Sequence, residues 1–287
     1  MVDNATGEAF CSKDSHYFGL HPSNRPRRAR PEAQVDVEAR AASPTPSPVV
    51  PVPINHIGRI TGVFFNPKET FTDIARRPSW LVPIIVLTIL SICVSILMNQ
   101  KIDWDSYIRK QAERSPRFEQ LSEEQKQTAL GPQIKITYYA TYAAGVLIPG
   151  VFALILTLVY WGIFNGMAGA QFRFGQVYGL VAHASMPSAI ASVLIIITLA
   201  LRPYGESTPE NMLASSLHTF LPGDAPRWLQ SLGGSVELFW IWTMILFVIG
   251  FSAANPKKIS FGKGLSFILG IWIVYVAIKV GLAAAFS

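Results

Sequence analysis

The feature that most constrains this chain is a pair of long apolar segments, residues 134–166 and 177–201, joined by a short polar stretch. A bilayer core about 30 Å thick needs about 20 apolar residues in a helix that rises about 1.5 Å per residue. Each segment provides that many, and the polar stretch between them has room only for a tight turn. The sequence therefore predicts a transmembrane helical hairpin.

Aromatic residues near both ends of the first segment indicate how it lies in the membrane. Tyr138, Tyr139 and Tyr142 stand at one end, and Tyr160 and Trp161 stand one bilayer thickness further along. Tyr and Trp gather at membrane–water interfaces because their rings are apolar and their tips are polar. We therefore expect both ends of this helix to be held at the interfaces.

Three further apolar runs bring the expected number of spans to five. They cover residues 80–98, 236–254 and 264–286, and polar connections separate them from the hairpin. The expected fold class is all-α: a polytopic integral membrane helical bundle with five transmembrane helices and short interfacial helices. This membrane domain should occupy residues 54–287.

Residues 1–53 differ in character from the rest of the chain. They show little apolar periodicity and are rich in Pro, Ser, Ala and Arg, with alternating Ser or Thr and Pro at 43–48. Such a composition buries too little apolar surface to offset the entropy of ordering, so we expect a disordered N-terminal tail. No basic start is followed by an apolar run, so no signal peptide is expected.

The charge balance is that of a membrane protein with polar loops. The chain carries a formal net charge of +6 with 50% hydrophobic residues. Its basic residues are spread through the tail and loops, so we expect no nucleic-acid partner. Cys11 lies in the tail and Cys93 in an apolar span, which predicts no disulfide, metal or redox site.

Short helices are expected next to the spans. An amphipathic segment covers residues 55–65, and Asn66, Pro67 and Glu69 then read as an N-cap, a first helical position and a capping acid. Two surface helices are expected within 99–133, ending at a Gly-Pro stop. Trp104, Tyr107 and Ile108 form the apolar stripe of the first, and a further short helix is expected near 210–217.

Four blocks of sequence resemble a known family. Residues 65–71 (FNPKETF) and 74–80 (IARRPSW) precede the first span, and 172–178 (FRFGQVY) and 182–187 (AHASMP) open the third. These blocks resemble the bacterial branch of the Ypt-interacting-protein (Yip) domain family. The resemblance implies five spans, a cytosolic N-terminus and, for bacterial members, a membrane protein without an established activity. Eukaryotic members bind Rab-type GTPases, but their Tyr-Gly-Pro element before the first span is not found here.

Ionisable or strongly polar residues at membrane depth are candidate functional residues, because burying them is costly. Asn165, His183 and Lys279 are the candidates here. For His183 the functional interpretations are a proton relay or a metal or haem ligand, but further ligands at usable spacing are missing. We favour a neutral His183 hydrogen-bonded between helices, to Asn165, Ser185 or a Tyr hydroxyl, and a Lys279 that snorkels to the interface.

Small residues and a proline mark candidate positions of close helix packing. Small residues one turn apart let two helices approach closely in a membrane. The candidates are Gly162, Gly166, Gly175, Gly179 and Pro187. We expect the face around Gly179 and His183 to receive the first arm of the hairpin, near Gly162 and Gly166.

These observations predict a non-catalytic integral membrane protein that recruits or organises partners at the membrane, with no catalytic residue and no cofactor. The alternative is a small transporter or channel subunit that uses the His183 face. Expected partners are membrane lipids and proteins of unknown identity, and a homo-oligomer stays open. Short basic segments place the N-terminus in the cytosol and the C-terminus on the opposite side, in a bacterial inner membrane. These segments carry Arg76, Arg77, Arg173, Lys257, Lys258 and Lys263.

Overall fold

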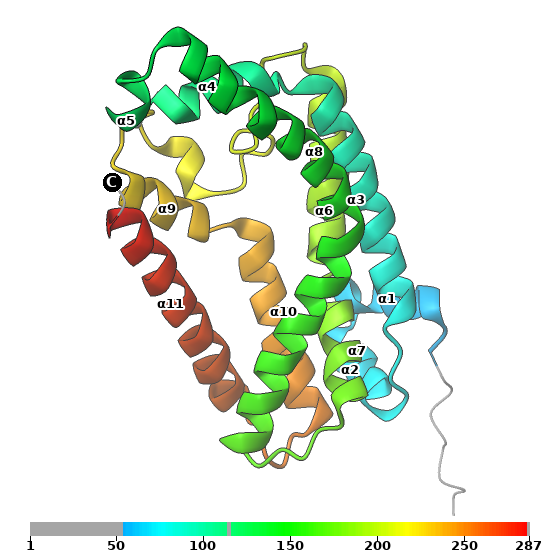
Figure 1. Ribbon diagram of the computed structural model, residues 1–287. Helices are drawn as coiled ribbons and strands as arrows, with labels where there is room; N and C mark the ends of the chain where they lie inside the picture. The colour runs from blue at the N-terminus through cyan, green and yellow to red at the C-terminus, as the bar shows by residue number, and fades with distance from the viewer. Residues whose placement is uncertain (1–53, 114–115, 286–287) are drawn as a thin grey trace, which may run out of the picture. The chain divides into compact units, whose positions relative to one another are not determined.

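The computed structural model describes residues 54–113 and 116–285, and the regular elements within these ranges are helices (Figure 1). The predicted all-α class is therefore confirmed. The expected disordered tail, residues 1–53, lies outside the described residues.

Four stretches are long and apolar enough to cross a membrane. They are α3 (Leu81–Lys101), α6 (Glu123–Gly166), α7 with α8 (Phe174–Leu201) and α11 (Phe261–Ala285). Only 11% of the apolar window of α11 is buried, so most of its surface is suited to lipid. The helix α10 (Leu238–Ala254) is apolar but has 17 residues, about 26 Å of helix. It is shorter than the four candidate spans.

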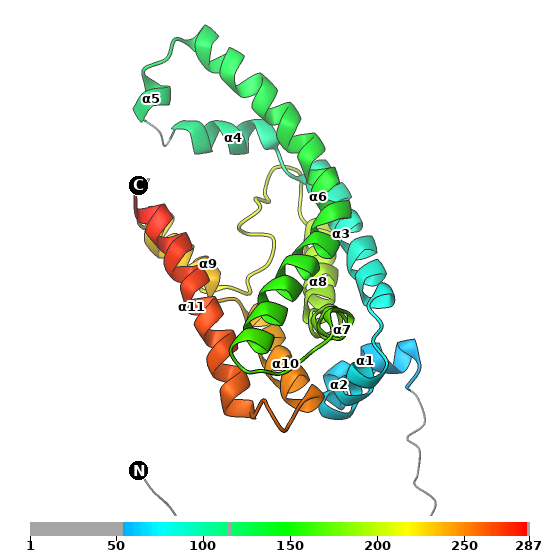
Figure 2. The ribbon, with the colours of Figure 1, turned by 60° about the horizontal axis from the view of Figure 1, so that its bottom comes forward.

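The short helix α10 lies at the centre of the bundle, with α2, α7, α8 and α11 packed around it (Figure 2). Aromatic side chains make its contact with α6. Phe251 stacks on Phe164 with ring centroids 4.2 Å apart, and Phe247 meets Tyr160 at 5.0 Å. These side chains are buried. The core is therefore built around α10, an apolar helix that is shorter than each of the four candidate spans.

The predicted third span, 177–201, is not one helix but two. α7 ends at Ala184 and α8 (Pro187–Leu201) begins after two intervening residues, Ser185 and Met186. Pro187 has no backbone N–H and its ring would clash with the carbonyl of His183 in a continuous helix. The Met186 N–H instead bonds that carbonyl at 3.1 Å, in a tighter turn. Residues 181–184 and Met186 are buried, so the irregular backbone is covered by protein.

The Gly-Pro stop predicted at 131–132 is wrong, because α6 continues through it as a helix of 44 residues. Leu130 gives the reason: it is buried against Trp104 and Ile108 of α4 (Trp104–Glu113). This contact holds the turn before Pro132 in place, so the proline does not end the helix. The second expected surface helix is largely the first turns of α6, preceded by the short α5 (Pro116–Glu119).

The helix predicted near 210–217 is also wrong. Asn211 there closes a turn, because its side-chain oxygen accepts the Thr208 N–H at 2.7 Å. The helices of this connection come later, as the 3₁₀ helix η2 (Leu217–Phe220) and α9 (Arg227–Ser235). Gly233 allows η2 and α9 to pack closely, because a Cβ at this position would lie 3.0 Å from the backbone nitrogen of His218.

Two short helices precede the first span as expected: α1 (His56–Phe65) and α2 (Pro67–Arg76). Asn66 stands at the N-cap position of α2 and Pro67 at its first helical position, as predicted, but the expected capping bond of the Asn66 side chain is not present. Its side chain accepts no backbone N–H and instead donates to Glu69 at 2.5 Å. Asn55 is the residue that caps, because its side-chain oxygen accepts the Gly58 N–H at 2.6 Å at the start of α1.

This geometry gives a prediction about the two asparagines. Asn55→Ala should lower stability by about 1 kcal/mol, because it removes an N-cap, and Asn66→Ala should lower it less. The measurement is thermal aggregation of both variants in one uncharged detergent. A larger effect at Asn66 would mean that the contact with Glu69 matters more than the cap at Asn55.

Candidate functional site: the basic end of the bundle

Three segments far apart in the sequence meet at one end of the bundle. They are the C-terminus of α2, the turn at 167–173 between α6 and α7, and the loop at 255–260 after α10. Gln176 donates to the Ala75 carbonyl at 2.8 Å, and Asn255 donates to the Ala170 carbonyl at 2.9 Å. The first bond joins α2 to the start of α7, directly after the turn, and the second joins the loop to the turn. We call the surface that these segments form the basic end.

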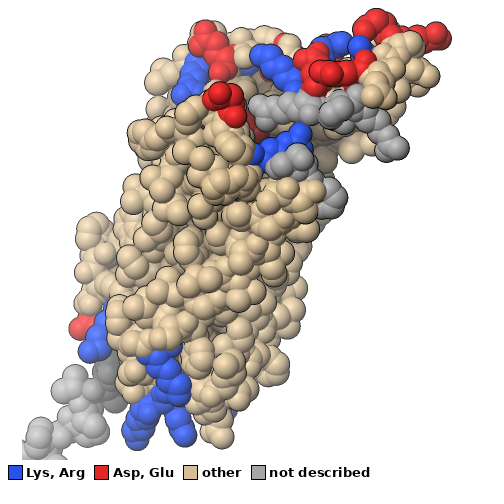
Figure 3. All heavy atoms as spheres, turned by 90° about the vertical axis from the view of Figure 1, so that its left-hand side faces the viewer, with Lys and Arg blue, Asp and Glu red and all other residues tan. Residues whose placement is uncertain are grey.

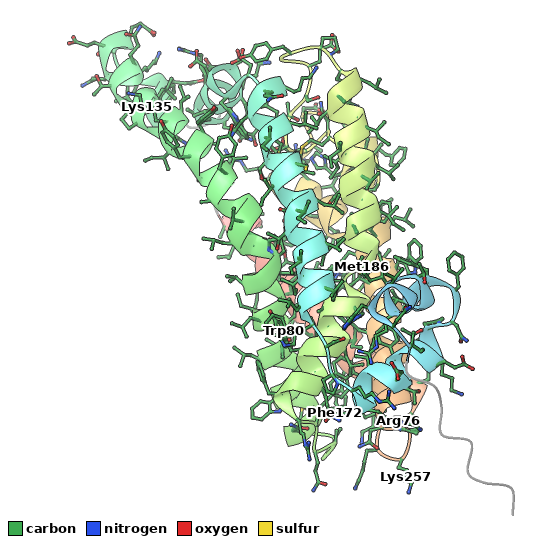
Figure 4. The ribbon with its side chains drawn as sticks, turned by 90° about the vertical axis from the view of Figure 1, so that its right-hand side faces the viewer. Arg76, Trp80, Lys135, Phe172, Met186 and Lys257 are labelled. Atoms are coloured by element: carbon green, nitrogen blue, oxygen red, sulfur yellow. The ribbon has the colours of Figure 1, made fainter. Side chains whose placement is uncertain are left out.

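The basic end carries exposed Lys and Arg side chains. They are Arg76, Arg77, Arg173, Lys257, Lys258 and Lys263. On the face shown in Figure 3, Lys and Arg predominate at this lower end, charge is absent across the middle, and charges of both signs lie at the upper end. Figure 4 shows Arg76, Phe172 and Lys257 together at the same end. The surface is therefore suited to an acidic partner or an anionic membrane face.

Arg59 holds α1 to this end of the molecule. Its guanidinium forms an ion pair with Asp73 of α2, with Nη2 and Oδ2 2.7 Å apart and Nε donating at 2.8 Å. Its Nη1 donates to the Arg77 carbonyl at 3.0 Å and to the Ser79 hydroxyl at 2.6 Å. One side chain thus joins α1, α2 and the segment that leads into α3.

The Arg59 junction is almost fully buried. The Arg59 side chain is 5% exposed and that of Asp73 is 15% exposed. Removing one partner of a buried ion pair leaves the other charge without compensation, which costs about 3–5 kcal/mol. The orientation of α1 and α2 therefore depends on both residues.

The prediction is that Arg59→Ala or Asp73→Ala lowers stability by about 3 kcal/mol, because each leaves one buried charge unpaired. The double variant Arg59→Met/Asp73→Leu should lose less stability than the sum of the losses of the two single variants. Arg109→Ala is the control, since its 3.9 Å pair with Asp105 is exposed and should contribute under about 0.5 kcal/mol. Thermal aggregation in detergent measures all four. Equal losses at Arg59 and Arg109 would contradict this role.

His183 lies on α7, the helix that packs against α1 and α2. It is 1% exposed, and its Nδ1 lies 2.9 Å from the Gly179 carbonyl one turn earlier. The expected partners were Asn165, Ser185 or a Tyr hydroxyl, but the partner shown for the ring is its own helix backbone. Of the two surface pockets described, neither is lined by His183.

Gly179 lies one turn before His183 on α7 and lets a neighbouring segment of the chain come close to this helix. A Cβ at Gly179 would lie 3.0 Å from the Ser79 carbonyl oxygen and 3.3 Å from the Ile74 side chain. The neighbour is thus α2 and the segment before α3, whereas we expected the first arm of the hairpin. At Gly162, Gly166 and Gly175 an added Cβ would meet no atom within 4 Å.

The other candidate residues are spread over the molecule. Asn165 closes the turn after α6: its side chain accepts the Phe172 N–H at 2.7 Å and donates to the Phe172 carbonyl at 3.0 Å. Pro187 opens α8. Lys279 lies at the other end, where it donates to the Ser235 hydroxyl at 3.2 Å. The structure therefore brings only His183 and Gly179 together.

Bulk and hydrogen bonding can be separated at these two positions. Gly179→Leu should lower stability by about 1–3 kcal/mol, because the new side chain overlaps the backbone at Ser79. His183→Gln keeps a polar group and should change stability less. Thermal aggregation in one detergent compares them. A stable His183→Gln variant that has lost a measured flux or activity would contradict a purely structural role.

The Arg59 junction is not predicted by the sequence pattern. One signal was present: Arg59 stands four residues before Val63, so it shares the buried face of an amphipathic helix. An Arg on that face needs a buried acid as partner. Nothing in the spacing identifies that acid as Asp73.

The basic end offers exposed positive charge and hydrogen-bond donors. Among residues 54–113 and 116–285, no group of three or more His, Cys, Asp or Glu side chains is arranged to hold a metal ion. The basic end supplies positive charge on a surface fixed by buried hydrogen bonds. It can attract and orient an acidic surface.

The apolar helices and the two charged ends define a helical membrane protein. The Yip1 domain family matches residues 61–283, so the chain belongs to that family. Its members are in general non-enzymatic membrane proteins. Comparisons with curated proteins and with solved structures gave no match.

Proposed function

We propose that this Yip1-family protein recruits or organises acidic partner proteins at the membrane through its basic end, without catalysis. The observation that carries the proposal is the combination of exposed Lys and Arg with the buried Arg59–Asp73 pair. A rigid charged surface loses little entropy when it binds, and complementary charge speeds and orients association.

The proposal includes five spans, with α10 as the fourth, in a bacterial inner membrane. α10 is nearly long enough, at about 26 Å against a core of about 30 Å, and a local thinning of the bilayer covers the difference. The basic end then faces the cytosol, because short loops rich in Lys and Arg remain there. The C-terminus of α11 lies on the opposite side.

The alternative, a transporter or channel that uses the His183 face, gains no support from the geometry. His183 is 1% exposed, and the helix that carries it, α7, packs against α1 and α2. A pathway would need polar groups in line through several helices.

Topology can be tested with reporter fusions. Fusions at Pro48 and Lys257 should report the cytosol, and fusions at Gln125, Asp224 and Ser287 should report the opposite side, because five spans separate the termini. Matching signals at Pro48 and Ser287 would exclude an odd number of spans.

Partner binding can be tested by co-purification from native membranes. The double variant Lys257→Gln/Lys258→Gln should recover at least about fivefold less of any partner that the wild type recovers, as expected for the loss of about 1 kcal/mol. Lys135→Gln, an exposed position at the other end, should change nothing (Figure 4). Equal recovery by all three proteins would exclude the basic end as the binding surface.

A further inference from the structure

A cavity of about 890 Å³ lies at the end of the bundle opposite to the basic end. Its walls come from α4, the connection between α8 and α9, α9 itself, the start of α10 and the last turns of α11. Sites for small molecules commonly have volumes of about 300–1,000 Å³ and occur between helices of bundles. The cavity is therefore large enough for an organic ligand.

Lys279 brings a positive charge into this cavity from α11. Its neighbours on that helix, Ile278 and Leu282, are exposed as lipid-facing residues are. Its Nζ donates to the Ser235 hydroxyl at 3.2 Å and to the Ser231 carbonyl at 3.4 Å, which are neutral acceptors. Within the described ranges, no carboxylate oxygen lies within 4 Å of this Nζ. Among residues 54–113 and 116–285, Lys279 therefore makes no direct ion pair.

Two further cations, Lys110 and Arg227, line the cavity from α4 and α9. The lining carboxylates are already engaged by the protein. Glu210 accepts the Tyr107 hydroxyl. Glu237 caps α10, where it accepts the Phe239 and Trp240 N–H groups at 3.1 and 2.7 Å. The lining thus holds three cations, Lys110, Arg227 and Lys279, against two carboxylates, which is a formal net charge of +1.

The remaining lining is partly apolar. Ile195 contributes from α8, and Met212, Leu213 and Leu221 contribute from the connection that follows. Ile195 and Lys279 both belong to helices able to cross a membrane. The cavity thus reaches from the polar layer to the edge of the apolar layer, and it matches a ligand with an anionic head and an apolar chain.

We propose that this cavity binds a phosphate-bearing ligand with an apolar chain, and that Lys279 is the main contact of the phosphate. Lys binds phosphate as a compact charge with three donors. The ligand comes either from a membrane lipid or from a soluble phosphate ester, since both share this chemistry. The proposal does not depend on partner binding at the basic end.

The test is titration calorimetry of the full-length protein in an uncharged detergent. The probes are dihexanoyl phosphatidic acid, glycerol 3-phosphate, and dihexanoylglycerol, which has the chains but no phosphate. Lys279→Gln removes the charge. Gly234→Leu keeps the charge but places bulk in the cavity, since a Cβ at Gly234 would lie 4.0 Å from the Lys279 Nζ. Lys135→Gln is the matched control outside the cavity.

We expect the wild type and Lys135→Gln to bind dihexanoyl phosphatidic acid equally. Lys279→Gln and Gly234→Leu should bind it at least about tenfold more weakly. Weaker binding of glycerol 3-phosphate would show that the apolar chain is recognised and would identify a lipid as the source. Equal binding would show that only the phosphate is recognised, which would overturn the proposed role of the chain. Size-exclusion profiles and thermal stability check the fold, and Gly234→Leu provides the test if Lys279→Gln does not fold.

Three further results would overturn the proposal. One is unchanged affinity in the folded Lys279→Gln variant. Another is dihexanoylglycerol binding as tightly as dihexanoyl phosphatidic acid, which would show that the chains alone are recognised. The third is the absence of binding to the wild type.

Discussion

Peptide groups inside a bilayer have no water to bond, and this constraint governs the whole structure. It favours long helices such as α3, α6 and α11, whose backbone bonds are internal. It also explains where the one interrupted span is broken. The α7–α8 break at Ser185 and Met186 lies where the flanking residues are buried, so protein and not lipid surrounds the irregular backbone. Pro187 could not be accommodated this way on a lipid-facing surface.

The Arg59 junction stabilises the short helices that lie outside the spans. Short amphipathic helices such as α1 and α2 are marginally stable alone, since most helical stability comes from tertiary contacts. Arg59 supplies contacts to both helices and to the segment before α3. Gly179 lets α7 lie directly against this segment. The interfacial helices thereby become part of the bundle, which gives the basic end a defined arrangement.

The length and periodicity of apolar runs predicted the helical class, the hairpin and both interfacial helices, because these depend on local composition. The predictions fail where contacts between residues far apart in the sequence determine the structure. Leu130 packs on α4 and keeps α6 helical through Pro132, which no local rule indicates. At the candidate site, His183 was visible as a buried polar residue. The pairing of Arg59 with Asp73 was not, because it depends on how α1 folds back on α2.

The helix α6 has 44 residues, about 66 Å, which is roughly twice the thickness of a bilayer core. Its outer half continues into the polar layer and is packed against α4, which forms part of the cavity wall. Helices tilt when the surrounding bilayer becomes thinner. A tilt of about 10° would move the far end of a projecting segment of about 30 Å by about 5 Å. Such a tilt would displace α4 as well, and with it the Tyr107, Lys110 and Gln111 side chains that line the cavity.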